Sequence, residues 1–143
     1  MIIDHIAIVV RSLDRAIPFW QDAFGYAPMT SPVVNSRQRV RVVFLAKEGS
    51  ITIKLVEPAD PASPVSALAA RGGGLHHLCF RCEDISAELL RLQQRGMNIL
   101  AAPQPGEAFD NEPIAFVYAG HGLNVELIET SKKAALLARS SED

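Results

Sequence analysis

The chain has 143 residues, of which 48% are hydrophobic and 21% are charged. This length is typical of one domain, and the composition excludes a disordered or disulfide-dense chain. A formal net charge of −2 at pH 7 provides no basic excess for binding nucleic acid. No apolar run approaches the ~18 residues that span a bilayer, and residues 1–5 lack the pattern of a signal peptide. We therefore expect a cytoplasmic globular protein that binds neither nucleic acid nor a membrane.

The first part of the chain predicts a strand, a helix and a hairpin. Residues 4–10 form an apolar, β-branched run, and Ser12 then provides a helix-start signal. Apolar residues recur at helical spacing up to Gly25, where the predicted helix ends. Residues 40–45 and 51–56 predict two strands that pair around a short turn.

A Pro-rich linker lies between the two halves of the chain. It covers residues 57–64 and contains three prolines. Ser63 as the N-cap and Pro64 at the first helical position predict a short helix over 65–70. The three glycines at 72–74 end this helix.

The second part of the chain predicts the same elements in the same order. Residues 76–80 form an apolar strand, and Asp84 is the N-cap of a helix that ends at Gly96. Residues 114–118 and 124–128 predict another pair of strands. The order of elements therefore indicates an internal repeat.

One offset of 72 residues relates the two halves of the chain. It superimposes four landmarks: His5 on His77, Ser12 on Asp84, Phe44 on Phe116, and Lys54 on Glu126. A strand, helix and hairpin unit of ~70 residues cannot cover its own apolar sheet face, so two copies are expected to pack together. We predict an α+β fold in which two βαβββ repeats form one curved mixed sheet around a central cavity.

The predicted domain takes up nearly the whole chain. It covers residues 1–130, with repeat one at about 2–58 and repeat two at about 74–129. The linker and short helix occupy 59–73, and the tail at 131–143 is expected to form a short helix or to fray.

Four side chains are expected to meet inside this sheet. Equivalent positions of two packed repeats converge near the axis that relates them, which places His5 with His77 and Lys54 with Glu126. The carboxylate of Glu126 has apolar neighbours and needs a partner, which is either a metal ion or Lys54. His76 is adjacent to His77 and is expected to point to the opposite face of its strand, behind the site or at the surface.

Several sequence segments resemble the vicinal oxygen chelate superfamily, which includes glyoxalase I, extradiol dioxygenases, resistance proteins and methylmalonyl-CoA epimerase. They are Ile3–Ile8, Phe19–Gly25, Lys54–Pro58, Ser63–Val65, Gly74–Arg81 and Val125–Leu127. The likeness spans about residues 2–129 and is strongest to epimerase-like members, through the stretch from Ser63 to Arg81. It implies the glyoxalase-like βαβββ fold.

The resemblance also implies a metal site. His5, His77 and Glu126 match the ligand types of the superfamily, and the implied ion is Co, Mn, Ni, Zn or Fe(II). The fourth position holds Lys54 where the family has Gln or Glu, and a protonated lysine cannot ligate a cation. Either three ligands hold the ion, or Lys54 takes its place and no metal is bound.

The sequence departs from the epimerases at a second point. Their catalytic pair includes a carboxylate in or just before the strand that begins near Val40, whereas residues 35–39 contain no acid. Glu48 lies in the predicted hairpin turn and is interpreted as a solvated residue. The resemblance implies that Glu126 moves the proton, and Glu126 and Lys54 are the expected catalytic residues.

Other polar residues are expected to contact a substrate. Cys79 is expected to share the strand face of His77. Arg37 begins a series of arginines at 37, 39 and 41 that is expected to alternate along one strand face. Ser63 lies in the most epimerase-like stretch. Cys79 and Cys82 form a C-x-x-C within a predicted strand. Their side chains are expected to point in opposite directions, so we interpret them as small core residues rather than a redox or zinc motif.

Three functions remain open. The first is a metal-dependent isomerase or lyase that acts on a small carbonyl or acyl-CoA substrate through an enolate. The second is an Fe(II) enzyme that resembles the extradiol dioxygenases, since two His and one Glu form a facial triad. The third is a metal-free protein that binds a small molecule, as resistance-type members do. In each case a homodimer is expected.

Overall fold

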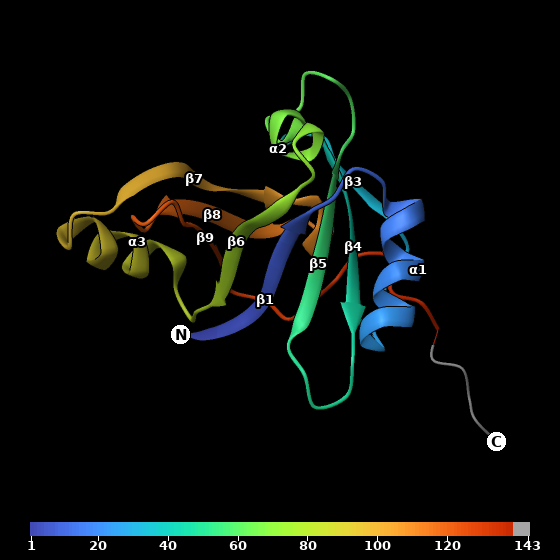
Figure 1. Ribbon diagram of the computed structural model, residues 1–143. Helices are drawn as coiled ribbons and strands as arrows, with labels where there is room; N and C mark the ends of the chain where they lie inside the picture. The colour runs from blue at the N-terminus through green and yellow to red at the C-terminus, as the bar shows by residue number, and fades with distance from the viewer. Residues whose placement is uncertain (139–143) are drawn as a thin grey trace.

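The computed structural model describes residues 1–138, which form one mixed β-sheet with three α-helices and a short 3-10 helix (Figure 1). The elements in chain order are β1 (Ile2–Val9), α1 (Leu13–Phe24), β2 (Ala27–Pro28), β3 (Val33–Asn35), β4 (Val40–Ala46), β5 (Thr52–Pro58), α2 (Ser66–Ala70), β6 (Gly74–Arg81), α3 (Ile85–Gln94), β7 (Asn98–Gly106), η1 (Glu107–Phe109), β8 (Glu112–Tyr118) and β9 (Asn124–Ile128). The strand order is β2-β4-β5-β1-β6-β9-β8-β7, and β3 also pairs with β4. The predicted α+β fold of two repeats in one sheet is confirmed.

The two repeats meet at the centre of the sheet. Strands β1 and β6 begin the two repeats and pair with each other in antiparallel orientation. On their other sides, β1 pairs in parallel with β5 and β6 pairs in parallel with β9, the last strand of each repeat. This arrangement relates the halves by a pseudo-twofold axis between β1 and β6, and it brings β5, β1, β6 and β9 side by side.

A glutamate at the end of each repeat caps the helix of the same repeat. The backbone N–H of Leu13 donates to Glu57 Oε2 at 2.6 Å, and that of Ile85 donates to Glu129 Oε1 at 2.7 Å. The two glutamates are 72 residues apart, so the offset extends to helix capping. The side chain of Asp84 also caps its helix, as predicted, whereas that of Ser12 makes no capping hydrogen bond.

The linker helix begins later than predicted. Helix α2 starts at Ser66, and the Ser63 hydroxyl accepts from the N–H of Val65 at 3.4 Å in a turn before it, so Ser63 is not the N-cap. Gly73 then passes close to β1 at φ +84, and a Cβ atom there would lie 2.1 Å from the carbonyl oxygen of Val9. This close approach requires glycine and leads the chain into β6.

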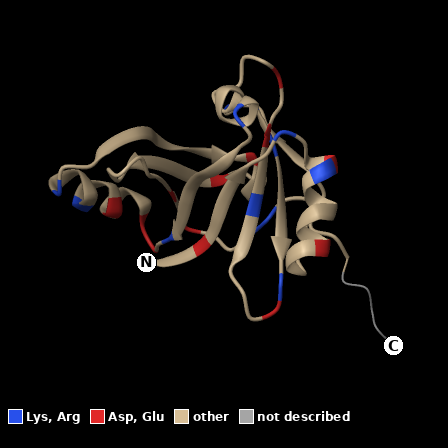
Figure 2. Ribbon diagram, viewed as in Figure 1, with Lys and Arg blue, Asp and Glu red and all other residues tan. Residues whose placement is uncertain are grey.

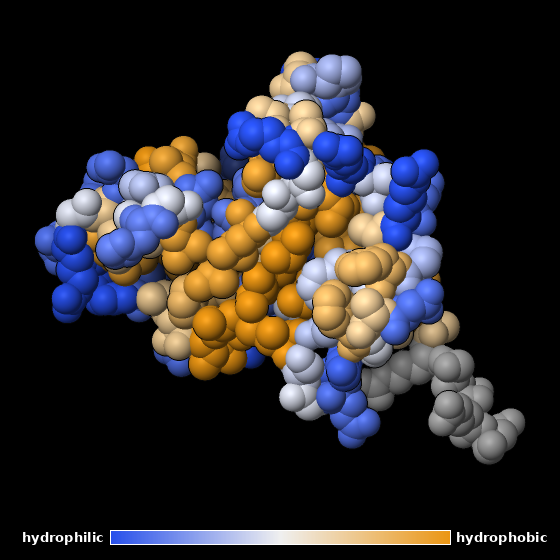
Figure 3. All heavy atoms as spheres, viewed as in Figure 1, coloured by the Kyte–Doolittle hydropathy of each residue, from blue (hydrophilic) through white to orange (hydrophobic). Residues whose placement is uncertain are grey.

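The helices α1 and α3 pack on the outer face of the sheet, each over its own repeat. The inner face carries a core with members from both repeats, among them Phe44, Phe109 and Phe116. Between α1 and α3 the central strands are not covered by a helix, and Figure 3 shows a continuous hydrophobic surface there. Most charged residues lie on helices and loops, and few interrupt the sheet (Figure 2).

The C-terminal segment, residues 130–138, is not helical as far as the structure describes it. Its backbone joins the first repeat through Ser31 N–H to Ala135 O at 2.9 Å and Leu137 N–H to Met29 O at 3.0 Å. It also joins the second repeat through Ala134 N–H to Ala108 O at 2.9 Å. The segment therefore ties the two halves together; the rest of the expected tail, residues 139–143, lies outside the described residues. None of the helices within residues 1–138 is both long and apolar enough to cross a membrane.

Candidate metal centre and active site

The four central strands bring His5, His77, Glu126 and Lys54 together. Ala7 of β1 lies opposite Lys54 on one side and His77 on the other. Cys79 of β6, 72 residues later, lies opposite His5 and Glu126 in the same way. Two small side chains therefore separate the four large polar ones.

Glu126 Oε1 lies at the centre of this group. It is 3.2 Å from Nε2 of His5, 3.3 Å from Nε2 of His77 and 3.7 Å from Nζ of Lys54. The relative exposure of these four residues is between 0 and 2%. The structure thus brings together, in the interior, the four side chains that the sequence analysis expected to meet.

Four buried atoms that could ligate a metal make no hydrogen bond with the described residues. They are Nε2 of His5, Nε2 of His77 and both carboxylate oxygens of Glu126. Buried polar atoms without partners are rare because each carries a desolvation cost. Ligand atoms of the three residues lie within 4.8 Å of one another, and two imidazoles with one carboxylate suit a divalent transition-metal ion. The residues present therefore fit such an ion.

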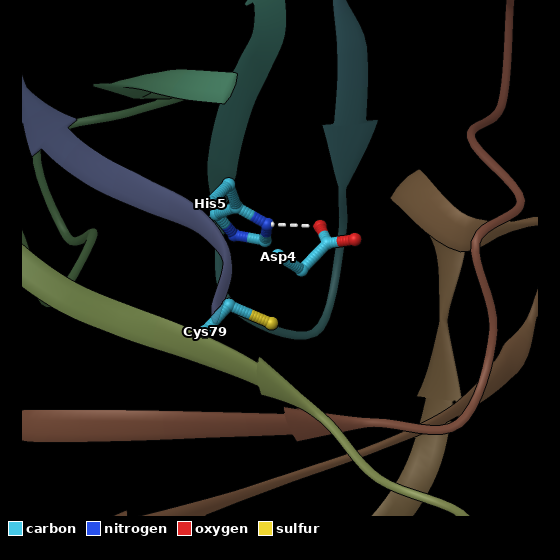
Figure 4. Close-up of side chains that lie close together, drawn as sticks. All are labelled: Asp4, His5 and Cys79. Atoms are coloured by element: carbon cyan, nitrogen blue, oxygen red, sulfur yellow. Dashed lines mark hydrogen bonds and ion pairs between the residues drawn. The ribbon is translucent and has the colours of Figure 1, made fainter. Parts of the chain in front are cut away.

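Asp4 sets the orientation of the His5 ring. Its Oδ2 lies 2.7 Å from Nδ1 of His5 (Figure 4). Because a carboxylate only accepts hydrogen bonds, His5 carries a proton on Nδ1, and Nε2 is the ring nitrogen that faces Glu126. Sequence reasoning missed Asp4, which an alternating strand would turn away from its neighbour.

Glu126 is the acidic group of the site, and Lys54 is the basic group beside it. Burial acts to raise the pKa of Glu126, but the positive charge of Lys54 and then the neighbouring His77 hold this pKa well below its ordinary value. Burial lowers the pKa of His77 to about 3, against the opposing attraction of Glu126. At neutral pH the site thus contains a carboxylate and a neutral His77 imidazole.

Cys79 is a weaker candidate for a metal ligand than the three residues above. It forms a close group with Asp4 and His5, but burial raises the pKa of its thiol and the nearby Glu126 adds to this shift. A protonated thiol is a poor ligand, and Nδ1 of His5 already bonds to Asp4. Both cysteines are buried and free, as the sequence interpretation expected.

Two aromatic rings and a second lysine line the site. Lys54 Nζ lies 5.7 Å from the ring centre of Phe44 and 5.3 Å from that of Phe109. Lys133, from the C-terminal segment, lies 5.1 and 5.3 Å from the same two centres. Its Nζ is also 3.1 Å from Oδ2 of Asp4, and its side chain is 6% exposed. The sequence carried no signal for Lys133, because it lies outside both repeats.

Other predicted residues lie elsewhere or point differently. Arg37 is exposed in the turn between β3 and β4, and only Arg41 belongs to a strand. The expected arginine face is therefore wrong: Arg39 pairs with Asp60 and Arg41 with Glu57. Ser63 is buried in the turn before α2.

The structure also shows where Glu48 and His76 lie. Glu48 is exposed in the turn between β4 and β5, as expected. The prediction that His76 points away from His77 is wrong, since Nδ1 of His76 lies 2.6 Å from Nδ1 of His77.

Comparison with known proteins agrees with this fold. Residues 4–116 match the family model described as Glyoxalase/Bleomycin resistance protein/Dioxygenase superfamily. The chain belongs to this superfamily, the group to which the vicinal oxygen chelate resemblance points.

Individual relatives are epimerases. The ethylmalonyl-CoA/methylmalonyl-CoA epimerase of Cereibacter sphaeroides is 28% identical over 118 residues, which cover 81% of this chain and 87% of the relative. The crystal structure of a methylmalonyl-CoA epimerase from Mycobacterium tuberculosis has a TM-score of 0.79 and 31% identity, covering 90% of this chain and 87% of the other. A methylmalonyl-CoA epimerase variant of Streptomyces coelicolor, in complex with 2-nitronate-propionyl-CoA, has a TM-score of 0.76 and 29% identity, covering 90% and 96%.

Proposed function

We propose that this protein is a divalent-metal-dependent isomerase or lyase of the epimerase type, acting on an acyl-CoA or a similar small carbonyl compound. The observation that carries the proposal is the convergence of the two Nε2 atoms and the Glu126 carboxylate, all buried and without hydrogen-bond partners. His5, His77 and Glu126 would hold the ion. A bound ion would polarise the substrate carbonyl and so make the neighbouring C–H more acidic.

The proposed proton transfers use Glu126 and Lys54. Glu126 is ionised at neutral pH and accepts the proton from the carbon next to the carbonyl, which leaves an enolate. The Lys54 ammonium returns a proton to that carbon. A final transfer from the Glu126 carboxyl to the Lys54 amine, whose O and N atoms are 3.7 Å apart, restores both groups. Lys54 thus serves as the proton donor that complements the Glu126 base.

The chemical class of the substrate follows from the relatives and from the charges. Similar proteins are named as acting on, or were solved with, acyl-CoA compounds. Two lysines, Lys54 and Lys133, face the aromatic rings of the site. They favour a substrate with an anionic carboxylate beside its thioester, such as methylmalonyl-CoA. Cys79, Arg37 and Ser63 remain proposed substrate contacts, of which Cys79 lies nearest to the ligand set.

Exchange of the acidic proton tests this proposal. The protein is loaded with Co²⁺ and incubated with methylmalonyl-CoA in D2O, and NMR follows the loss of the signal of the acidic C–H. Exchange that requires Co²⁺ and is lost in Glu126→Gln supports the proposal. Exchange at the same rate in Glu126→Gln contradicts it. Arg91→Ala is the surface control, because Arg91 pairs with Glu88 on α3 away from the site. Arg37→Ala tests separately whether Arg37 contacts the substrate.

A second candidate function rests on the position of Lys54. An ammonium 3.7 Å from Glu126, over the rings of Phe44 and Phe109, can neutralise the carboxylate in place of a metal. The protein would then bind a small molecule without turning it over. A folded protein that retains none of the divalent metals Mn, Co, Ni, Zn or Fe(II) would favour this function over the epimerase and over a dioxygenase-like Fe(II) enzyme.

We also propose a homodimer formed through the uncovered outer face of the central strands. Ile3 and Leu75 are equivalent residues of the two repeats and are 43% and 56% exposed. A patch that is symmetric about the pseudo-twofold axis suits an isologous contact with a second copy. Light scattering on the wild type and on Leu75→Asp tests this: a dimer that becomes a monomer supports the contact, and a monomeric wild type contradicts it.

A further inference from the structure

Two β-bulges occupy equivalent positions in the two repeats. In the pairing of β1 with β6, the register shifts between Ile3 and His5, so that Asp4 is the extra residue of β1. It shifts again where His77 lies opposite Ala7 and Leu75 lies opposite Ile8, so that His76 is the extra residue of β6. Asp4 and His76 are 72 residues apart, the offset of the repeat.

Each bulge changes the direction of one side chain. In a regular strand, neighbouring side chains point to opposite faces, whereas a bulge redirects the extra residue. Asp4 thereby reaches Nδ1 of His5 at 2.7 Å, and His76 reaches Nδ1 of His77 at 2.6 Å. In both repeats, the residue before the candidate ligand therefore bonds to the ring nitrogen that faces away from Glu126.

The two partners differ in chemistry. A carboxylate can only accept, so Asp4 requires the proton of His5 on Nδ1 and leaves Nε2 free as a ligand atom. A neutral imidazole can donate or accept through Nδ1, so His76 permits two tautomers of His77. Only the tautomer in which His77 donates to His76 has a free lone pair on Nε2.

We propose that Asp4 and His76 are positioning residues that set the tautomers of the two histidine ligands, Asp4 by fixing one tautomer and His76 by allowing two. The inference rests on the proposed metal site, but the tautomers exist without metal. Asp4 is itself held in place by Lys133 at 3.1 Å and by Arg81 at 3.6 Å. The first repeat therefore presents a fixed ligand, and the second presents one whose tautomer metal binding selects.

Exchange of the two residues between the repeats tests the inference. His76→Asp gives the second repeat the partner of the first, and Asp4→His does the reverse. Nitrogen-15 NMR of the metal-free protein should show a proton on Nδ1 of His5 throughout and a mixture of tautomers for His77. In His76→Asp, Nδ1 of His77 should likewise carry a proton throughout, and the dissociation constant for Co²⁺ should fall by roughly tenfold to a hundredfold.

A matched variant separates shape from hydrogen bonding. His76→Asn has the shape of the aspartate, but its amide can rotate to donate or to accept, so His77 should remain a mixture. Asp4→His should convert His5 to a mixture and weaken Co²⁺ binding by a similar factor. If Asp4→His does not fold, His76→Asp and His76→Asn still test whether the residue before the ligand sets the tautomer.

Two outcomes would overturn the inference. One is a His77 that keeps the same tautomer populations in His76→Asp as in the wild type. The other is a Co²⁺ affinity that the His76→Asp substitution leaves unchanged while the tautomer shifts. A wild type without epimerase activity that still shows these tautomers and Co²⁺ affinities would contradict the proposed function alone.

Discussion

Lys54 Nζ lies 3.7 Å from Oε1 of Glu126, at positions that the repeat makes equivalent. The superfamily resemblance implies a metal ligand at each of these positions, whereas this chain places a buried ammonium opposite a buried carboxylate. The two side chains either exchange protons during catalysis, or Lys54 neutralises Glu126 in place of a metal ion.

Lys54→Gln should tighten the binding of divalent metals. It removes a positive charge from beside the cation and supplies an amide oxygen as a fourth ligand. We expect the dissociation constant for Co²⁺ to fall by at least about tenfold, measured by calorimetric titration. Lys54→Met is the matched control, because it removes the charge without adding a ligand and should give a smaller gain. Equal affinity of the wild type and Lys54→Gln would show that Lys54 does not influence the ion.

Glu126→Gln should abolish metal binding and lower the stability of the metal-free protein. It leaves the buried Lys54 without its carboxylate, and breaking a buried pair costs about 3 kcal/mol. Urea unfolding measures the free energy of unfolding of each variant. The double variant Glu126→Gln with Lys54→Met should recover much of the loss, because neither charge then remains buried. Additive losses in the double variant would contradict a coupled pair.

The metal-free protein should lose stability as the pH falls below about 6.5. The folded pKa of His77 is about 3, below its value in the unfolded chain, so the unfolded chain binds more protons between these values. Glu126 adds to the loss at lower pH, since its folded pKa is also depressed. Urea unfolding at pH 7.5 and pH 5 should differ by about 2 kcal/mol from His77 alone. His77→Gln should flatten this dependence, and an unchanged slope would contradict the prediction.

Lys133→Met should destabilise the protein and loosen the C-terminal segment. The substitution removes the 3.1 Å ion pair with Asp4, whose side chain is only 7% exposed, and we expect a loss of about 2 kcal/mol. Lys132→Met is the matched control, since the Lys132 side chain is 63% exposed and pairs with Glu112 at the surface. Hydrogen exchange should show faster exchange of the Ala134 and Leu137 amides in Lys133→Met only. Equal effects of both substitutions would contradict the inference that the Lys133–Asp4 ion pair holds the C-terminal segment in place.

The repeat made much of the site predictable. The equivalence of His5 with His77 and of Lys54 with Glu126 depends on periodicity, and parallel pairing of β1 with β5 and of β6 with β9 converts it into proximity. The helix caps at Glu57 and Glu129 obey the same offset and could have been found by it. Cys79 as a small residue between larger ones also follows from the alternation of side chains along a strand.

The residues that were missed or given the wrong orientation depend on local irregularity or on tertiary contact. Asp4 and His76 required two bulges, which break the alternation on which strand predictions rest. Lys133 reaches the site only because residues 130–138 cross both repeats, a contact that no local pattern encodes. The arginine series failed because Arg39 has φ +56 in a turn, so the strand begins only at Val40.

Metal content is the most direct test of the proposed centre. Protein purified without an affinity tag or chelator is assayed by mass spectrometry, before and after incubation with Mn, Co, Ni, Zn and anaerobic Fe(II). We predict about one equivalent of metal per chain in the wild type, and none in Glu126→Gln or His77→Gln. A folded wild type that retains no metal under any of these conditions would contradict the metal centre and favour Lys54 as the counterion of Glu126.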